Sequence, residues 1–373
     1  MDDDCDTIIV GAGPAGLAVA ASLRRKGVSF EILDRGDGVG ASWRRHYDRL
    51  HLHTPKRHSA LPFLPYPKTF PRYPSRDQVV EYLEAYARQF DLRPTFGADV
   101  TRCARTVDDA WQIDTNNSSR RARHLVVASG FNRVPRLPTW PGLDDFAGAL
   151  LHSSDYANAD PFRAQRVLVI GFGNSGAEIA LDLSERGADC AVAVRGPVNV
   201  VPRDILGIPV TSFALATRRL PPRIADRLNA LSIRVAIGDL ARLGLVKRKD
   251  GPSEEILKSR QVPVVDVGTI AAIRGGRIRV RPAVESFSRD AIRFVDGRSE
   301  TFDAVVLATG FETGLPAMFP NESVLFDRCG RPQVCGREAA TGLYFCGFDL
   351  VPTGLIRQIG IESVRIADRI AAG

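Results

Sequence analysis

The sequence contains few cysteines and no Cys-x-x-Cys pair. Its six cysteines lie at positions 5, 103, 190, 329, 335 and 346. Thiols scattered in this way are typical of reduced cysteines, because disulfide frameworks show cysteines at close and regular spacing. We therefore expect free thiols, with Cys329 and Cys335 close in sequence only incidentally, and no redox centre built from two thiols.

Long apolar runs are absent as well. No segment approaches the roughly 18 uncharged apolar residues that a membrane helix needs. The first residues, Met1-Asp2-Asp3-Asp4, are acidic and lack the basic and apolar regions of a signal peptide. We therefore expect no membrane span and a cytoplasmic location.

Lysine is scarce: the chain has only six lysines, so its net charge of +7 comes mostly from arginine. The basic residues are spread along the chain and form no stripe, which argues against a nucleic-acid partner. A net positive field would help to attract anionic ligands. Histidines 46, 51, 53 and 58 crowd one region, but their spacing fits no tetrahedral zinc motif. We therefore predict no metal site.

A glycine-rich turn near the N-terminus joins a short apolar strand, 7–10, to a helix rich in alanine and leucine. The turn reads Gly11-Ala12-Gly13-Pro14-Ala15-Gly16. Its three glycines would make the tight turn, let the backbone approach a pyrophosphate, and let the helix lie close to the strand. A second strand, 28–33, ends at Asp34, whose carboxylate can bind the hydroxyls of an adenosine ribose. This unit predicts a dinucleotide site.

The same construction is repeated later in the chain. An apolar strand, 166–170, leads into Gly171-Phe172-Gly173-Asn174-Ser175-Gly176 and a helix that ends near Gly187. The following strand, 189–194, ends in Val194 where the first unit has Asp34, and Arg195 follows. A carboxylate there would repel the 2′-phosphate of NADPH, whereas an arginine can bind it. We therefore assign FAD to the first turn and NADPH to the second.

A second internal repeat suggests how the two domains are connected. Segment 124–131 resembles segment 303–311, since both are buried-strand patterns that lead into small residues. With 373 residues, the chain is also long enough for two domains. We predict an α/β protein with two Rossmann-like dinucleotide-binding domains, in which the NADPH domain is inserted into the FAD domain. The expected parts are 1–159 for FAD, 160–305 for NADPH, and 306–373 for FAD again.

Two further segments have recognisable patterns. Residues 54–76 are rich in proline, which excludes a regular helix or central strand and predicts an extended wall near a ligand. Residues 221–240 have Ile224, Leu228, Leu231 and Val235 at helical spacing. The simplest interpretation is a helix that packs through this apolar face, and the alternatives are a substrate lid or a membrane-facing helix.

Segment 146–156 connects the sequence to a known family. Its residues Phe146, Gly148, His152 and Tyr156 resemble the F-x-G-x-x-x-H-x-x-x-Y/F motif of class B flavin monooxygenases. Baeyer–Villiger relatives typically have tryptophan at the position of Tyr156. Together with both glycine turns and the Ala308-Thr309-Gly310 turn, the resemblance extends over nearly the whole chain.

Other segments resemble the YUCCA indole-3-pyruvate monooxygenases and their bacterial relatives. They are residues 47–56, 82–87, 201–203, 238–245 and 266–269, whereas segment 347–354 departs from the plant pattern. The resemblance implies that NADPH reduces FAD and that O₂ forms a flavin C4a-hydroperoxide. It implies oxidative decarboxylation of indole-3-pyruvate to indole-3-acetate, or otherwise oxygenation of another small aromatic or carboxylate-bearing substrate.

We expect two sets of cofactor contacts. The FAD set is Gly11, Gly13, Pro14, Ala15, Gly16, Asp34, Arg35, Ser42, Trp43, His53, Val100, Gly130 and Asp349. The NADPH set is Gly171, Gly173, Asn174, Ser175, Gly176, Arg195 and Arg203. Lys56 is the first candidate for contact with a substrate carboxylate or the hydroperoxide, with Arg203 and Arg357 as alternatives and a solvated loop lysine as the competing interpretation.

Several alternatives remain open at this point. N- or S-oxygenation and Baeyer–Villiger oxidation use the same flavin chemistry, although Tyr156 and Ala157 argue against the latter. A disulfide reductase would need the missing Cys-x-x-Cys pair. A flavin-binding module without turnover would not need two intact nucleotide motifs. The sequence also leaves open whether the chain is a monomer or a homodimer.

Overall fold

The computed structural model describes residues 5–373, which form two compact units. The first unit consists of the chain up to residue 44, residues 54–134 and residues 311–373. The second consists of residues 45–53 and 135–310. Along the chain, the second unit therefore lies between parts of the first.

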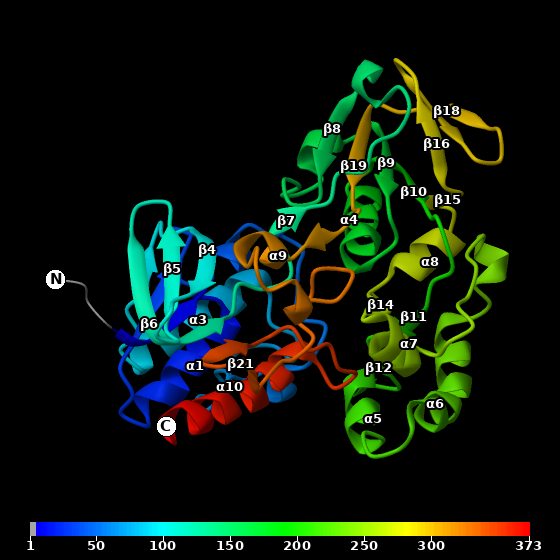
Figure 1. Ribbon diagram of the computed structural model, residues 1–373. Coiled ribbons are helices and arrows are strands. Elements are labelled where there is room, and N and C mark those ends of the chain that lie inside the picture. The colour runs from blue at the N-terminus through cyan, green and yellow to red at the C-terminus, as the bar shows by residue number, and fades with distance from the viewer. Residues whose placement is uncertain (1–4) are drawn as a thin grey trace. The chain divides into compact units, whose positions relative to one another are not determined.

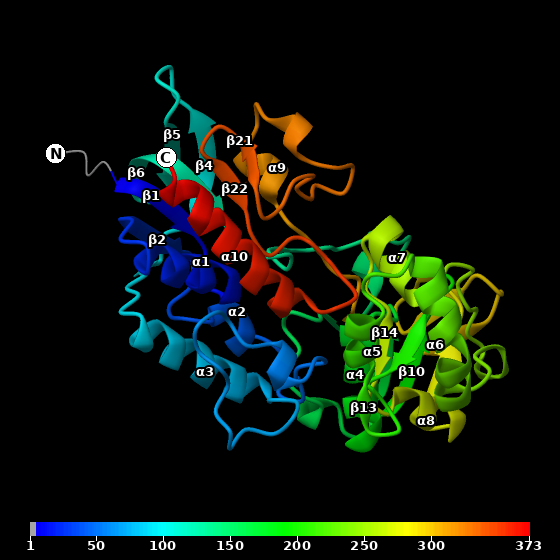
Figure 2. The same ribbon diagram turned by 90° about the horizontal axis from the view of Figure 1, so that it is seen from below.

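The first unit is built on a mainly parallel sheet in the order β21-β22-β6-β1-β2-β3. Figure 1 labels β6 of this sheet, with β5 and β4 beside it. Strand β1 lies between β2 and β6, and the first glycine turn follows it. Figure 2 shows the C-terminal helix α10 alongside α1. The helices are α1 (Pro14–Arg24), α2 (Ala41–Arg44), α3 (Arg76–Gln89), α9 (Leu315–Met318) and α10 (Leu355–Ala371). The strands are β1 (Cys5–Val10), β2 (Phe30–Asp34), β3 (Thr95–Phe96), β4 (Val100–Arg105), β5 (Trp111–Thr115), β6 (Ser119–Val127), β20 (Phe311–Glu312), β21 (Glu338–Ala340) and β22 (Leu343–Phe345).

The second unit has a parallel sheet in the order β15-β10-β9-β19-β8, and β7 (Val134–Pro135) lies at its boundary. Its helices are α4 (Asn174–Glu185), α5 (Val210–Ala216), α6 (Pro222–Ile237), α7 (Pro252–Ser259) and α8 (Thr269–Arg274). Its strands are β8 (Ala149–His152), β9 (Arg166–Ile170), β10 (Asp189–Ala193), β11 (Val200–Pro202), β12 (Asp204–Ile205), β13 (Ile208–Pro209), β14 (Val264–Asp266), β15 (Ile278–Arg281), β16 (Val284–Phe287), β17 (Ala291–Phe294), β18 (Ser299–Thr301) and β19 (Ala304–Leu307).

The four predicted nucleotide-fold strands are present as β1, β2, β9 and β10. Each lies between two other strands of its sheet, and most of the apolar side chains of these four strands are buried, as is usual in parallel sheets. The two segments that repeat each other also occupy equivalent places, since β6 lies beside β1 and β19 lies beside β9. The two units therefore share one arrangement of strands around the glycine turn.

The units divide the chain differently from the predicted boundaries in three places, of which the shortest is residues 306–310, which belong to the second unit. Residues 135–159 belong to the second unit because β8 joins its sheet beside β19. Residues 45–53 also belong to it, and the Asp48 amide donates to the Ala157 carbonyl at 2.8 Å. A division read from the glycine turns alone cannot include these pieces, because their pairing is decided at long range.

The interpretation of α6 as a helix packed through its apolar row is wrong. Ile224, Leu228, Leu231 and Val235 are exposed, and the helix packs instead through Ala225, Ile233 and Ile237. Among residues 5–373, no helix combines the length and apolarity needed to cross a membrane. All six cysteines are free thiols, as predicted.

Candidate cofactor sites

In the first glycine turn, backbone atoms leave no room for a side chain at Gly11 or Gly16, whereas the space next to Gly13 is empty. Gly11 has a φ of +113°, and a Cβ there would lie 2.5 Å from the Ala128 carbonyl oxygen. A Cβ on Gly16 would lie 1.7 Å from the Gly11 carbonyl oxygen, so α1 can begin this close to β1 only without a side chain. A Cβ on Gly13 would meet nothing within 4 Å. The open position lies at the start of α1, where helix N–H groups favour a phosphate.

Asp34 is held beside this turn by the backbone. One carboxylate oxygen accepts from the Ala12 amide and the other from the Gly36 amide, each at 2.6 Å. Each oxygen keeps a second lone pair that can accept a hydroxyl. The carboxylate is therefore oriented at the end of β2, where the ribose of a dinucleotide bound at the turn would lie.

Other residues predicted for FAD gather around the same turn in the first unit. The amide of Gly40, just before Ser42 and Trp43, donates to the Ala12 carbonyl at 3.4 Å. The Ala98 amide, two residues before Val100, donates to the Asp34 carbonyl at 3.0 Å. Gly130 has a φ of +76° in the loop that follows the Gly11 contact at Ala128. Arg35 is exposed and donates to the Arg133 carbonyl at 3.2 Å.

The second glycine turn repeats this geometry. Gly171 has a φ of +113°, and its Cβ would lie 2.4 Å from the Ala308 carbonyl oxygen. A Cβ on Gly176 would lie 2.1 Å from the Gly171 carbonyl oxygen, while one on Gly173 would meet nothing within 4 Å. Both units therefore offer the same cradle for a pyrophosphate at the carboxyl end of a central strand.

The environment after the second strand differs between the units. Val194 follows β10 and its amide donates to the Arg281 carbonyl at 2.9 Å. Arg195 comes next, is exposed, and makes no ion pair or side-chain hydrogen bond with any residue in 5–373. A free guanidinium without a neighbouring acid suits a phosphate monoester. Arg203, the weaker candidate, is half-buried and lies 3.7 Å from Asp204.

Two predicted NADPH residues use their side chains to support the turn. The Asn174 amide oxygen accepts from the Val265 amide at 2.8 Å, and its nitrogen donates to the Pro263 carbonyl at 3.2 Å. The Ser175 hydroxyl bonds to the phenol of Tyr47. Their backbone N–H groups, at the start of α4, remain available to a phosphate.

Segment 45–53 places a polar cluster behind the second turn. The Glu178 carboxylate on α4 is buried and accepts from the Tyr47 phenol and from His53 Nε2. Burial, and then the Glu178 charge, hold the pKa of Tyr47 well above its usual value of 10. His53 was predicted at the FAD site, but the structure joins it to α4 of the second unit. The sequence prediction did not include Tyr47 or Glu178. The acid on the buried face of α4 could have indicated Glu178.

The prediction that Lys56 contacts the substrate is not supported. Its Nζ donates to the carbonyl oxygens of Pro67, Lys68 and Phe70 at 2.9, 2.9 and 2.5 Å. An ammonium group has three donors, and all three are used. Lys56 therefore holds the proline-rich loop together, and its charge is already satisfied.

A third residue missed by the sequence prediction is Glu362, which is buried on α10 and linked to Asp349 through Gln358. Its carboxylate accepts from the Gly347 amide at 2.8 Å and from Gln358 Nε2 at 3.2 Å. Gln358 also donates to Asp349 at 3.1 Å, so one amide links the two acids. Gly347 reaches α1, since a Cβ on it would lie 3.0 Å from that of Ala15. Glu362 thus orients the segment that brings Asp349 to the first glycine turn.

Burial, with a further contribution from Asp349, raises the pKa of Glu362 to about 7 from its ordinary value of 4.5. A raised folded-state pKa means that its contribution to stability is complete below about pH 4.5 and is lost as the pH rises through 7. Glu362→Gln cannot ionise. We therefore expect the free energy of unfolding of the wild type, relative to this variant, to fall between pH 5 and 8 by an amount on the order of 3 kcal/mol, which lowers its relative melting temperature.

Glu338→Gln is the matched control for this prediction. The Gly342 amide, and to a lesser extent Arg369, lower the pKa of Glu338, so it stays ionised throughout this range. Its effect on melting temperature should therefore be constant from pH 5 to 8. A constant difference for Glu362→Gln as well would contradict the assignment.

The family motif in residues 146–156 has a structural role in the second unit. Phe146 packs edge-to-face on Phe287, and a Cβ on Gly148 would lie 2.7 Å from the Asp303 carbonyl oxygen. His152 Nε2 lies 3.1 Å from the Gly310 carbonyl oxygen, and Tyr156 donates to Asp182 at 2.7 Å. Through these contacts, the motif residues hold the segment around β8 against β19 and α4 of the second unit.

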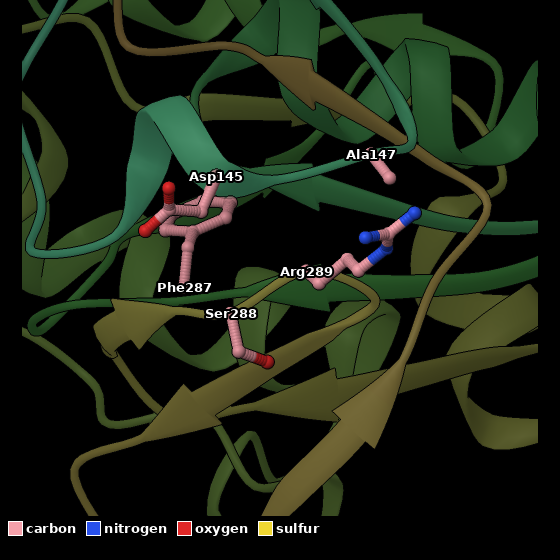
Figure 3. A pocket seen from close by; sticks show the side chains of 5 residues that line it. All are labelled: Asp145, Ala147, Phe287, Ser288 and Arg289. Carbon is pink, nitrogen blue, oxygen red and sulfur yellow. The ribbon is translucent and has the colours of Figure 1, made fainter.

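A surface hollow lies next to this motif, and Figure 3 shows its lining residues. They are Asp145, Ala147, Phe287, Ser288 and Arg289. None of the predicted cofactor residues lines it. Within residues 5–373, no three potential metal ligands come together there or elsewhere.

Comparisons with known proteins identify the family of this chain. The family model for "Pyridine nucleotide-disulphide oxidoreductase" matches residues 8–205. Indole-3-pyruvate monooxygenase YUCCA1 of Oryza sativa subsp. japonica is 41% identical over 348 residues, covering 91% of this chain and 86% of the relative. Probable indole-3-pyruvate monooxygenase YUCCA4 of Arabidopsis thaliana is 39% identical over 349 residues, covering 91% and 84%.

Among solved structures, a flavin monooxygenase from Stenotrophomonas maltophilia aligns with a TM-score of 0.77 at 23% identity. The alignment covers 100% of this chain and 99% of that chain. At this identity the likeness concerns the fold alone. The fold described here therefore also occurs in a protein described as a flavin monooxygenase.

Proposed function

Because the chain belongs to the family of flavin-dependent monooxygenases that includes the YUCCA indole-3-pyruvate monooxygenases, we propose that it oxidatively decarboxylates indole-3-pyruvate. The balanced reaction consumes the 2-oxo acid, O₂, NADPH and a proton, and yields indole-3-acetate, CO₂, water and NADP⁺. The observation that carries the proposal is the 41% identity to YUCCA1, which extends over 91% of this chain.

In this proposal the first unit holds FAD and the second unit, inserted in the sequence, holds NADPH. The backbone at Gly13 and the start of α1 would bind the FAD pyrophosphate, and Asp34 its adenosine ribose. The backbone at Gly173 and α4 would bind the NADPH pyrophosphate, and Arg195 its 2′-phosphate. Reduced FAD would supply the oxygen-activating chemistry, through the C4a-hydroperoxide that the family resemblance implies.

The protein's own residues have positioning roles in this scheme. Asp349, held through Gln358 and Glu362, would fix the flavin-binding segment that follows β22. A substrate carboxylate would need a cation, and Lys56 cannot provide it because its donors are used. Arg203 and Arg357 remain the candidates for that contact.

The test is product analysis of the FAD-loaded protein with NADPH and ¹⁸O₂. We expect indole-3-acetate that contains one labelled oxygen, formed in step with NADPH consumption and absent without O₂. Parallel reactions receive a ketone, an amine and a sulfide. If indole-3-pyruvate yields only H₂O₂ while one of these is oxygenated, the substrate assignment fails and the monooxygenase class stands.

A further inference from the structure

Helix α6 of the second unit has a row of large apolar side chains that no residue of its own unit covers. Ile224, Leu228, Leu231 and Val235 are 46%, 62%, 72% and 78% exposed. They are spaced by three or four residues, so they lie on one face of the helix. The row is therefore a continuous apolar strip.

The opposite face of α6 attaches the helix to its unit. Ala225 and Ile237 are buried, and Ile233 packs against the core. Asp226 accepts from the amides of Ser253 and Glu254 at 3.0 and 3.1 Å, which joins α6 to α7. Figure 2 shows these two helices close together. The exposed strip consequently contributes little to the fold of the unit.

The unpaired charges beside the strip have one sign, whereas Arg223 pairs with Glu254 of α7 at 2.9 Å. At 100° per residue, Arg223, Arg227 and Arg234 fall along one border of the strip. Arg227 and Arg234 are exposed and make no ion pair with any residue in 5–373. Asp226 is the only acid between residues 222 and 237, and it faces α7. The outward surface of α6 is therefore apolar and cationic.

We propose that α6 docks the protein on a bilayer that contains anionic lipids, with the helix lying in the plane of the interface. An amphipathic helix with an apolar face and arginines along its border binds in this way: the apolar side chains enter the acyl boundary and the guanidinium groups bind phosphate headgroups. A second copy of the same face is a poor partner, because unpaired arginines would meet arginines. The docking does not depend on the substrate proposed above.

The experiment measures sedimentation of the FAD-loaded protein with phosphatidylcholine vesicles, with and without phosphatidylserine. We expect binding to the anionic vesicles that weakens as salt is raised. Leu228→Glu with Leu231→Glu should lower the partition coefficient at least about tenfold, since two apolar side chains no longer enter the bilayer. Arg227→Gln with Arg234→Gln should remove the preference for anionic vesicles.

The matched control is Val107→Glu with Val324→Glu, which changes two valines that are 108% and 78% exposed outside α6. This control should bind vesicles like the wild type, and all variants should keep the wild-type melting temperature. The proposal is overturned if the wild type shows no preference for anionic vesicles, or if the double leucine variant binds normally. It is also overturned if the wild type forms a dimer that the leucine variant abolishes, because the strip would then belong to a second copy.

Discussion

Replacing Gly13 by alanine is expected to yield a folded protein that purifies without its flavin. The residue has φ −82° and ψ −172°, which alanine adopts without strain, and its Cβ would meet nothing within 4 Å. The methyl group would instead occupy the space through which a pyrophosphate approaches the backbone. Losing even one charge-assisted contact costs roughly 1.5–3 kcal/mol, so we expect FAD to bind at least tenfold more weakly.

Gly173→Ala is the matched variant in the second turn, where the Cβ position is equally open. It should retain FAD and lose affinity for the nicotinamide cofactor. Flavin absorbance, chromatography of the extracted cofactor, and the melting temperature of the apoprotein provide the measurements. Recovery of FMN alone from the wild type, or normal FAD affinity in Gly13→Ala, would show that the first turn does not bind a dinucleotide.

Arg195→Ala should raise the KM for NADPH by about tenfold or more and leave the KM for NADH almost unchanged. The side chain is exposed and unpaired among residues 5–373, so removing it disturbs no contact of the protein. A charge-assisted bond to a phosphate is worth about 1.5–3 kcal/mol, and 1.4 kcal/mol corresponds to tenfold. Steady-state oxidation of both cofactors gives the comparison.

Arg298→Ala is a suitable control, because that arginine is also exposed in the second unit and pairs only weakly with Asp296, at 3.6 Å. It should change neither KM. Equal losses with NADPH and NADH in Arg195→Ala would mean that the arginine supports the turn and does not read the 2′-phosphate.

The nucleotide motifs could be predicted because their geometry is local. Gly11 and Gly16 are five residues apart, Gly11 needs a positive φ, and the Gly11 carbonyl leaves no room for a side chain on Gly16. Asp34 and Val194 stand at equivalent strand ends, so their difference is visible from spacing alone. Such patterns specify a fold and a type of ligand before any long-range contact is known.

Prediction from local patterns fails for residues whose partners lie elsewhere in the chain, and the examples here are Lys56, His53 and Glu362. Lys56 looked like a free cation, and only the folded loop reveals that Pro67, Lys68 and Phe70 satisfy it. His53 lies in sequence between segments of the first unit, yet it bonds to Glu178 of the second. In the sequence, Glu362 cannot be distinguished from an exposed acid on a helix. Its role depends on its burial and on its hydrogen bond with the Gly347 amide.

The apolar row of α6 shows the same limit of sequence-based prediction for a row of residues on the protein surface. Its spacing identified an amphipathic helix from sequence, but spacing cannot say whether the apolar face is covered. That depends on which neighbours the chain brings to it, and the structure puts Ala225 and Ile237 on the packed side.

The sequence by itself determined that this chain has two dinucleotide turns, which of them carries an acid, and which family it resembles. These properties follow from residues a few positions apart, where backbone geometry leaves few alternatives. The tertiary structure alone decided which charges are satisfied, which acids are buried, and which apolar face stays open. Those properties depend on contacts between residues far apart in the chain, such as Glu178 with His53, and the order of the residues does not encode them locally.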